Sequence, residues 1–225
     1  ATQLAGEDNA KTDRIQPRAD WMQIERERGI SVVTSVMTFE YDNHVFNLLD
    51  TPGHEDFADD TYRTLTAVDA AVMVIDAAKG IEPQTLKLFE VCRLRDIPII
   101  TFVNKMDREA RNPFEILDEV EQKLALDCAP MTWPIGQGKS FSGTYHLAKS
   151  AIRLSDKETA LTPVNGPESD KVAGLLPENE RETFIEETSL AAEACKPFDL
   201  EAFREGHLTP VYFGSALRNF GVRDL

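Results

Sequence analysis

The chain has 225 residues, enough for one domain with a substantial core or for one domain that carries an insertion. Its 39 acidic and 24 basic residues give a net charge of −15, which argues against generic nucleic-acid binding and against docking on an anionic membrane. No apolar stretch approaches the roughly 20 residues of a membrane-spanning helix. The odd number and wide spacing of the three cysteines favour a reduced protein of the cytoplasm.

The first part of the chain is predicted to hold a polar lead-in and a β-hairpin. Residues 1–20 are polar and aperiodic, and Trp21–Arg28 is a short, charged helical candidate that Gly29 ends, so we expect residues 1–30 to form a partly disordered lead-in. Residues 31–41 and 44–49 are rich in residues that favour strands, and Asp42-Asn43 lies between them. We therefore expect two antiparallel strands joined by a tight turn.

The next part alternates short apolar strands with helices. Residues 70–75 and 97–103 are almost continuously apolar, as in strands buried on both faces of a parallel sheet. Prolines favour helix starts at residues 83 and 113, and these helices are expected to run to about residues 95 and 126. This alternation predicts an α/β fold: a mostly parallel sheet with helices on both faces.

The strand–helix alternation stops at residue 128. We expect an α/β core at 31–127, an inserted α+β subdomain at 128–206 and a return to the core at 207–225. Short strands are expected at 131–135, 141–147 and 150–154, a Pro- and Gly-rich stretch at 162–177, helices at 180–194 and 200–204, an apolar strand at 209–213, and the start of a helix at 221–225.

Asp50 directly follows the predicted strand 44–49 and is followed by Thr51-Pro52-Gly53-His54. Open α/β sheets bind ligands at the carboxyl ends of their strands, so Asp50 is placed to order Mg²⁺ and the Gly53 N–H to meet a terminal phosphate. His54 stands where a side chain could orient an attacking water. Taken alone, a plain turn is an equally good interpretation of this segment.

Asn104-Lys105-Met106-Asp107 directly follows the predicted strand 97–103. The Asp107 carboxylate can accept hydrogen bonds from both N1–H and the exocyclic amine of guanine, a pairing that adenine does not offer. Asn104 can bond N7 and brace the loop, and the aliphatic stem of Lys105 can cover the ring face. A solvated turn is the alternative, but the strand in front and the motif at Asp50 favour a guanine site.

Gly214-Ser215-Ala216 follows the last predicted strand. Small residues at this point allow a backbone N–H to approach the oxygen of the base, which adds to the preference for guanine. Such a tripeptide is a common turn when taken alone. Behind a third parallel strand, and in this order, it completes a guanine pocket.

Arg28-Gly29-Ile30-Ser31 precedes the first predicted strand. The Ser31 hydroxyl could close over Mg²⁺ and the terminal phosphate as a switch segment, although a glycine loop that only leads into a strand is the simpler alternative. The four motifs together, in one order and in consistent strand contexts, predict a domain that binds GTP or GDP with Mg²⁺.

The sequence contains no G-x-x-x-x-G-K-[ST] string, the loop that holds nucleotide phosphates. Gly136-Gln137-Gly138-Lys139-Ser140 imitates its end, but it has the wrong spacing and follows the guanine motif, so we interpret it as a hairpin turn. We expect the first strand and the phosphate loop to lie upstream of Ala1, and the chain alone to bind nucleotide very weakly.

With these motifs in place, the chain resembles the ribosome-associated translational GTPases, in which a His follows the Gly of the first motif as His54 follows Gly53. The resemblance is greatest to the family of bacterial peptide chain release factors 3, and it covers most of residues 20–225. The segments that carry it are Asp20–Met22, Arg28–Ser31, Thr34–Met37, Asp50–Phe57, Asp60–Asp69, Thr132–Gly136, Tyr145–Leu147 and Thr209–Ala216.

The resemblance implies a role for each of these residues. Ser31 takes the switch position where elongation factors usually carry Thr, and His54 positions the water when the ribosome activates hydrolysis. The guanine pocket is implied to consist of Asn104, Lys105, Asp107 and Ser215, with Ala216 beside it.

The resemblance also implies a function for the complete protein. The family uses GTP hydrolysis to remove codon-reading release factors from the ribosome after peptide release, and it continues into further β-barrel domains. Two alternatives stay open: an elongation factor G-like translocase domain, and a non-catalytic GTPase-like interaction module.

Overall fold

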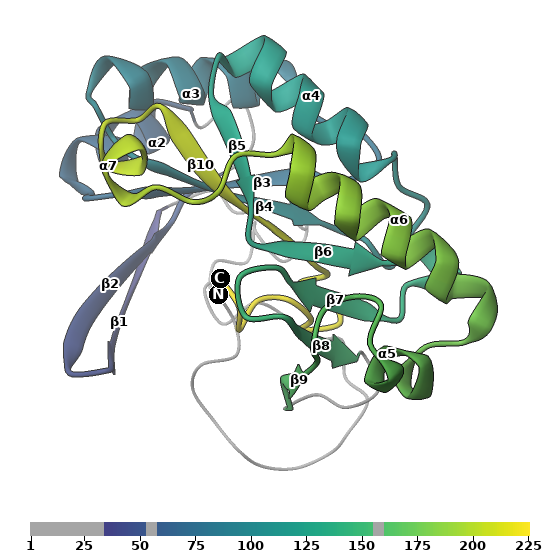
Figure 1. Cartoon of the computed structure of the whole chain (residues 1–225). Helices are drawn as coiled ribbons and strands as arrows, with labels where there is room; N and C mark the ends of the chain where they lie inside the picture. The colour runs from purple at the N-terminus through teal and green to yellow at the C-terminus, as the bar shows by residue number, and fades with distance from the viewer. Residues whose placement is uncertain (1–33, 53–57, 155–159) are drawn as a thin grey trace. The chain divides into compact units, whose positions relative to one another are not determined.

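The computed structural model describes residues 34–52, 58–154 and 160–225 (Figure 1). The chain forms two compact units, residues 1–68 and residues 69–225. Ser31, Gly53 and His54 lie outside the described residues.

The first unit contains the expected hairpin. Strands β1 (Ser35–Tyr41) and β2 (His44–Asp50) pair antiparallel over their whole lengths. Asp42 and Asn43 between them have φ angles of +48° and +59°, the left-handed conformation that a two-residue hairpin turn requires and that Asp and Asn tolerate. Helix α2 (Ala58–Thr64) and the short 3₁₀ helix η2 (Leu65–Ala67) follow in the same unit.

The second unit is built on a four-stranded parallel sheet in the order β3–β4–β10–β5. Its strands are β3 (Ala71–Asp76), β4 (Ile99–Asn104), β5 (Asp127–Pro130) and β10 (Leu208–Phe213). The last strand of the chain inserts between β4 and β5, so every pairing except β3–β4 joins distant parts of the sequence. Four of the six residues of β4 and five of the six of β10 are buried, as expected for apolar runs in a parallel sheet. Strand β3 differs from the prediction, because its Val72 and Val74 are exposed on one face.

Helices α3 (Pro83–Leu94) and α4 (Pro113–Leu124) flank this sheet and contact each other (Figure 1). Both begin with a proline in the first turn, as predicted. In α4 the Asn112 side chain caps the first turn by accepting a hydrogen bond from Phe114 N at 2.9 Å, and Ala125 ends the helix at a φ of +49°. The predicted α/β class with a flanked parallel sheet is confirmed.

A second sheet is antiparallel, in the order β6–β7–β8–β9. Its strands are β6 (Thr132–Ile135), β7 (Gly143–His146), β8 (Ala151–Leu154) and β9 (Thr162–Pro163). Helices α5 (Asp170–Leu175) and α6 (Glu178–Ala194) pack with it around a core of Ile135, Tyr145, Ile152, Val164, Val172, Leu176 and Phe184. A short helix, α7 (Leu200–Arg204), then leads back to β10.

Three local expectations were wrong or incomplete. Strand β5 was not predicted, and it places residues 127–130 in the parallel sheet. Helix α5 lies inside the Pro- and Gly-rich stretch for which no element was predicted. Residues 221–225 form a turn instead of the start of a helix, with Asp224 N donating to Gly221 O at 3.2 Å.

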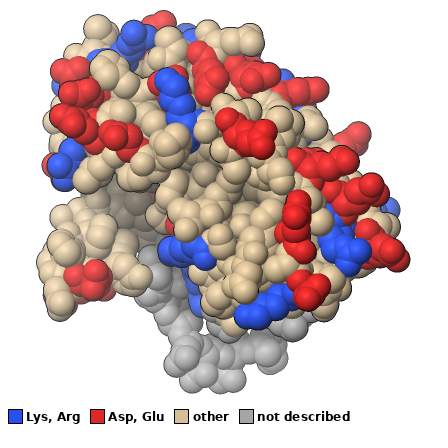
Figure 2. Space-filling model, viewed as in Figure 1, with Lys and Arg blue, Asp and Glu red and all other residues tan. Residues whose placement is uncertain are grey.

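Acidic side chains gather along α6 on the face shown in Figure 2. This helix contains six Glu and one Arg, and the segment 165–205 that includes it has 11 acidic and 4 basic residues. Nearly half of the net charge of the chain, −7 of −15, therefore lies in residues 165–205. Among the described residues, no helix combines the length and the apolar character needed to span a bilayer.

Candidate functional site

The carboxyl ends of β3, β4 and β10 bring the predicted guanine motifs together. In the parallel register Asp76 pairs with Asn104, and Val103 pairs with Phe213, so the segments after β4 and β10 leave the sheet at the same edge. Met106 N donates to Gly214 O at 3.1 Å, which ties the two segments directly. Ligands of open α/β sheets bind at this edge.

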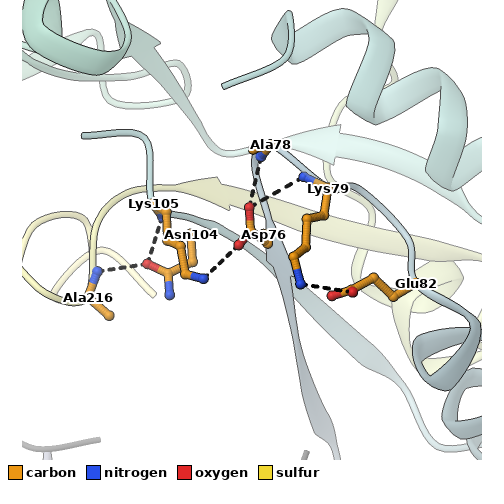
Figure 3. Close-up of polar contacts among 7 residues, drawn as sticks. All are labelled: Asp76, Ala78, Lys79, Glu82, Asn104, Lys105 and Ala216. Atoms are coloured by element: carbon orange, nitrogen blue, oxygen red, sulfur yellow. Dashed lines mark hydrogen bonds and ion pairs between the residues drawn. The ribbon is translucent and has the colours of Figure 1, made fainter. Parts of the chain in front are cut away.

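Asn104 joins the two segments through its side chain (Figure 3). Its Oδ1 accepts hydrogen bonds from the backbone N–H groups of Lys105 and Ala216, both at 2.8 Å. The predicted bracing role of Asn104 is thus visible in the structure. The Ala216 N–H therefore already donates a hydrogen bond to Asn104 in this structure.

Lys105 leaves β4 with a φ of +72°, and its ammonium turns toward the end of β3. Lys105 Nζ lies 2.6 Å from Asp76 Oδ2. The other carboxylate oxygen, Asp76 Oδ1, accepts from Ala78 N at 2.9 Å and from Lys79 N at 3.4 Å. Burial raises the pKa of Asp76, but the hydrogen bonds from Lys105 and the backbone outweigh it and hold that pKa below its ordinary value of 3.8.

Asp76 was missed in the sequence analysis. The signal that could have found it is the rule applied to Asp50: a carboxylate at the end of an apolar strand, here β3, lies at the ligand edge of the sheet.

The Asp107 carboxylate is nearly buried, with 6% of its side chain exposed. Its Oδ2 lies 3.5 Å from Arg218 Nε, and the Arg218 side chain is 56% exposed. Its Oδ1 has no hydrogen-bond partner among the described residues. A buried carboxylate oxygen without a donor is costly, so a ligand that supplies N–H groups here would relieve that cost.

Ser215 and Gly214 shape the segment after β10. Ser215 is fully buried and exchanges backbone hydrogen bonds with Phe220, at 2.9 Å and 2.8 Å. Its Oγ accepts from Arg218 N at 3.3 Å. A Cβ on Gly214 would collide with the Phe220 carbonyl oxygen and lie 2.9 Å from the Phe102 ring, so only glycine fits this position.

The imitation of a phosphate loop at Gly136–Ser140 is a hairpin connection, as predicted. It contains the 3₁₀ turn η3 (Gly138–Ser140) and joins the antiparallel strands β6 and β7. Gly138 N donates to Met106 O at 2.8 Å, so the connection supports the segment that carries Asp107.

The predicted magnesium side of the site is described only in part. Asp50 is the last residue of β2, and Pro52 O accepts a hydrogen bond from Thr61 Oγ1 at 3.0 Å. In residues 34–52, 58–154 and 160–225, no cluster of three or more His, Cys, Asp and Glu could hold a metal ion. An Asp carboxylate and a Ser hydroxyl are oxygen donors that suit Mg²⁺, but the roles of Asp50 and Ser31 stay predictions.

Comparison with known proteins identifies the family to which the chain belongs. Residues 2–225 match the family described as the elongation factor Tu GTP binding domain. The chain is 53% identical over 229 residues to peptide chain release factor 3 of Aromatoleum aromaticum, an alignment that covers all of this chain and 42% of that protein. This chain thus spans less than half of that relative.

A crystal structure of a Thermus thermophilus protein shares the fold, with a TM-score of 0.71 and a sequence identity of 22%. The match covers 92% of this chain and 33% of that chain. The parallel sheet, the loops at its carboxyl edge and the match over residues 2–225 lead to one conclusion: the chain belongs to the family of elongation factor Tu GTP binding domains.

Proposed function

We propose that this chain supplies the guanine-nucleotide site of a ribosome-dependent translational GTPase of the release factor 3 type. One observation carries the proposal: Asp107, nearly buried beside Asn104 and Lys105, has a carboxylate oxygen with no hydrogen-bond partner among the described residues. Guanine offers two parallel N–H donors to such a carboxylate, whereas adenine presents an acceptor at N1.

Each residue at the edge has a distinct task in this proposal. Asp107 accepts hydrogen bonds from N1–H and the exocyclic amine. Asn104, whose Oδ1 is used by two backbone N–H groups, keeps its amide N–H groups for N7. The stem of Lys105 covers one face of the ring, and the segment at Ser215 and Ala216 closes the pocket on the side of the base oxygen.

The phosphate and metal side is proposed from the sequence motifs. Asp50 and Ser31 hold Mg²⁺ together with the phosphates of GTP or GDP, and the Gly53 N–H meets the terminal phosphate. His54 orients the attacking water. The metal supplies charge neutralisation on the phosphates when it is bound.

The role of the complete protein is also a proposal. We propose that it acts in the cytoplasm on the ribosome and uses GTP hydrolysis to recycle codon-reading release factors in termination. The 53% identity to a release factor 3 favours this role over that of an elongation factor G-like translocase. In the same proposal the GTPase core consists of residues 31–127 and 207–225 as predicted, extended by β5 (Asp127–Pro130), and the inserted subdomain is the remainder of residues 128–206.

The Asp107→Asn variant tests the base-recognition proposal. The change replaces one acceptor oxygen by a donor, so GDP should bind about tenfold or more weakly, and xanthosine diphosphate, which has an oxygen in place of the exocyclic amine, should bind better than GDP. Because the sequence has no phosphate-loop string, the wild-type chain should bind GDP only weakly, and titration followed by NMR suits this range.

Asp118→Asn is the matched control. Asp118 is an exposed carboxylate on α4, and its replacement should leave binding of both nucleotides unchanged. If Asp107→Asn and wild type prefer GDP to the same degree, the pocket assignment is wrong. Hydrolysis by the complete protein on ribosomes distinguishes the GTPase from a non-catalytic interaction module.

A further inference from the structure

Asp76 uses its two carboxylate oxygens for different partners (Figure 3). Oδ1 accepts hydrogen bonds from the backbone at Ala78 and Lys79, which shapes the turn after β3. Oδ2 faces away from that turn and meets Lys105 Nζ at 2.6 Å. The Asp76 side chain is only 15% exposed, so the ion pair is shielded from water on the carboxylate side.

Lys105 needs such a partner if its side chain is to have a fixed place. The Lys105 side chain is 44% exposed and its own backbone is in the left-handed region, so little packing restrains the four-carbon stem. Immobilising a free lysine on binding a ligand would cost side-chain entropy. The bond to Asp76 orders the ammonium before any ligand arrives, while 44% of the side chain stays exposed.

Register places this pair beside the residues that recognise the base. Asp76 is the Cα partner of Asn104 across β3 and β4, and Lys105 follows Asn104 directly. The ion pair with Asp76 therefore directs the Lys105 stem along the carboxyl edge of the sheet toward the end of β3.

We propose that Asp76 is a positioning residue for nucleotide binding, which holds the Lys105 stem in the orientation that covers one face of the guanine base. The inference rests on the proposed guanine pocket. Asp76 does not touch the base; it acts through Lys105.

The two roles of Asp76 can be separated by Asp76→Asn. Asn keeps an Oδ1 that can accept from Ala78 and Lys79, but it has no charge to hold the Lys105 ammonium. Lys105→Met removes the ammonium and keeps an apolar stem of similar length. The double variant completes a thermodynamic cycle.

The readouts are the dissociation constants of GDP and ADP from NMR titration, with thermal unfolding recorded for every variant. We expect Asp76→Asn to weaken GDP binding about twofold to tenfold, the cost of ordering one long side chain, and to change ADP binding less. In the Lys105→Met background the same change should have no further effect on GDP.

Glu82→Gln is the matched control, because Glu82 pairs with Lys79 in the same loop at 3.1 Å without contacting Lys105. It should leave the GDP dissociation constant unchanged. The inference is overturned if Asp76→Asn binds GDP like wild type. It is also overturned if Asp76→Asn raises the GDP dissociation constant by the same factor in the wild-type and Lys105→Met backgrounds, since Asp76 would then only shape the turn.

Asp107→Asn, measured in the same series, distinguishes the two possible failures. If it loses the preference for GDP while Asp76→Asn does not change binding, the pocket stands and only the role of Asp76 is wrong. If Asp107→Asn has no effect, or no nucleotide shifts any signal of the wild-type chain, the guanine pocket itself is wrong and the role of Asp76 falls with it.

Discussion

Two regions of the molecule each contain a buried polar atom that has no hydrogen-bond partner among the described residues. At the carboxyl edge of the parallel sheet this atom is Asp107 Oδ1, and in the antiparallel sheet it is His146 Nδ1. Asp107 lies on a loop beside the exposed Arg218, whereas His146 lies within β7, between β6 and β8. Burial lowers the pKa of His146, and the charge of Lys149 lowers it further, which favours the neutral ring.

The difference bears on the roles that we propose for the two regions. A ligand can supply the missing hydrogen-bond donor to a carboxylate oxygen on a loop. A ring nitrogen inside a sheet cannot be reached in this way, so the free-energy cost of leaving it unpaired is offset by the packing of the surrounding core. Other polar groups around the antiparallel sheet are paired within the protein, as Trp133 Nε1 is with Glu187 Oε2 at 3.1 Å. In our proposal the parallel edge recognises the nucleotide, and the antiparallel sheet contributes to stability.

Breaking the Arg153–Asp224 pair should have the largest effect on stability. Arg153 on β8 donates to both Asp224 oxygens, at 3.1 Å and 2.7 Å, and the two side chains are 11% and 4% exposed. Asp224→Ala removes both of these hydrogen bonds and the opposite charge from the buried guanidinium, so urea unfolding should show a loss of about 3–5 kcal/mol.

Lys196→Met is the control for that variant, since its pair with Asp127 at 2.6 Å is exposed. It should cost about 0–1 kcal/mol. Equal losses in the two variants would mean that the buried pair does not stabilise the antiparallel region in the way proposed.

Gly214→Ala should have the next largest effect, and it acts on the parallel edge. The added Cβ has to displace the Phe220 carbonyl or the Phe102 ring, which should cost about 1–3 kcal/mol of stability in urea unfolding. The displaced loop should also bind GDP more weakly.

Gly174→Ala is the matched change in the other region, because nothing lies within 4 Å of a Cβ at this position of α5. It should be neutral or stabilise by up to about 1 kcal/mol. A stable Gly214→Ala protein with normal GDP binding would contradict the close packing described for the parallel edge.

Asn104→Ala should cost about 1–2 kcal/mol, because the N–H groups of Lys105 and Ala216 lose their acceptor. Asn112→Ala, which removes the cap of α4, should cost about 1 kcal/mol. The two variants should nevertheless differ in function: only Asn104→Ala should weaken GDP binding. Similar GDP affinities would show that Asn104 braces the loop without serving the base.

The smallest effect is the pH dependence contributed by Asp76. Its pKa in the folded protein is below 3.8, so its contribution to stability is complete above 3.8 and is lost as the pH falls through the folded value. Urea unfolding of wild type and Asp76→Asn between pH 6 and pH 2 should therefore converge below pH 3.8. A constant difference across this range would mean that the Asp76 charge does not stabilise the fold.

Much of the fold could be predicted because it depends on local signals. Apolar runs marked β3, β4 and β10, and prolines marked the starts of α3 and α4. Strand β5 carried no such signal: it has four residues, ends in Pro130 and exists because it pairs with β10, about 80 residues later. Helix α5 has six residues in a Pro- and Gly-rich stretch, where tertiary packing of Val172 outweighs weak local propensity.

The candidate site divides in the same way. Asn104, Asp107 and Ser215 could be predicted as candidates because Asn104 ends an apolar strand and the other two closely follow one, each in a recognisable motif. The pairing of Lys105 with Asp76 depends on the β3–β4 register and on the left-handed backbone at Lys105, neither of which a motif reveals. The use of the Ala216 N–H by Asn104 likewise needs the contact between two loops that are distant in sequence.

The central claim, that the edge formed by β4 and β10 recognises guanine, is tested most directly by NMR titration of the labelled chain with GDP and, separately, with ADP. We predict that GDP shifts the backbone amide signals of Lys105, Asp107 and Ser215, and that ADP at the same concentration leaves these signals in place. Equal shifts with both nucleotides, or GDP shifts confined to the antiparallel sheet, would contradict the claim.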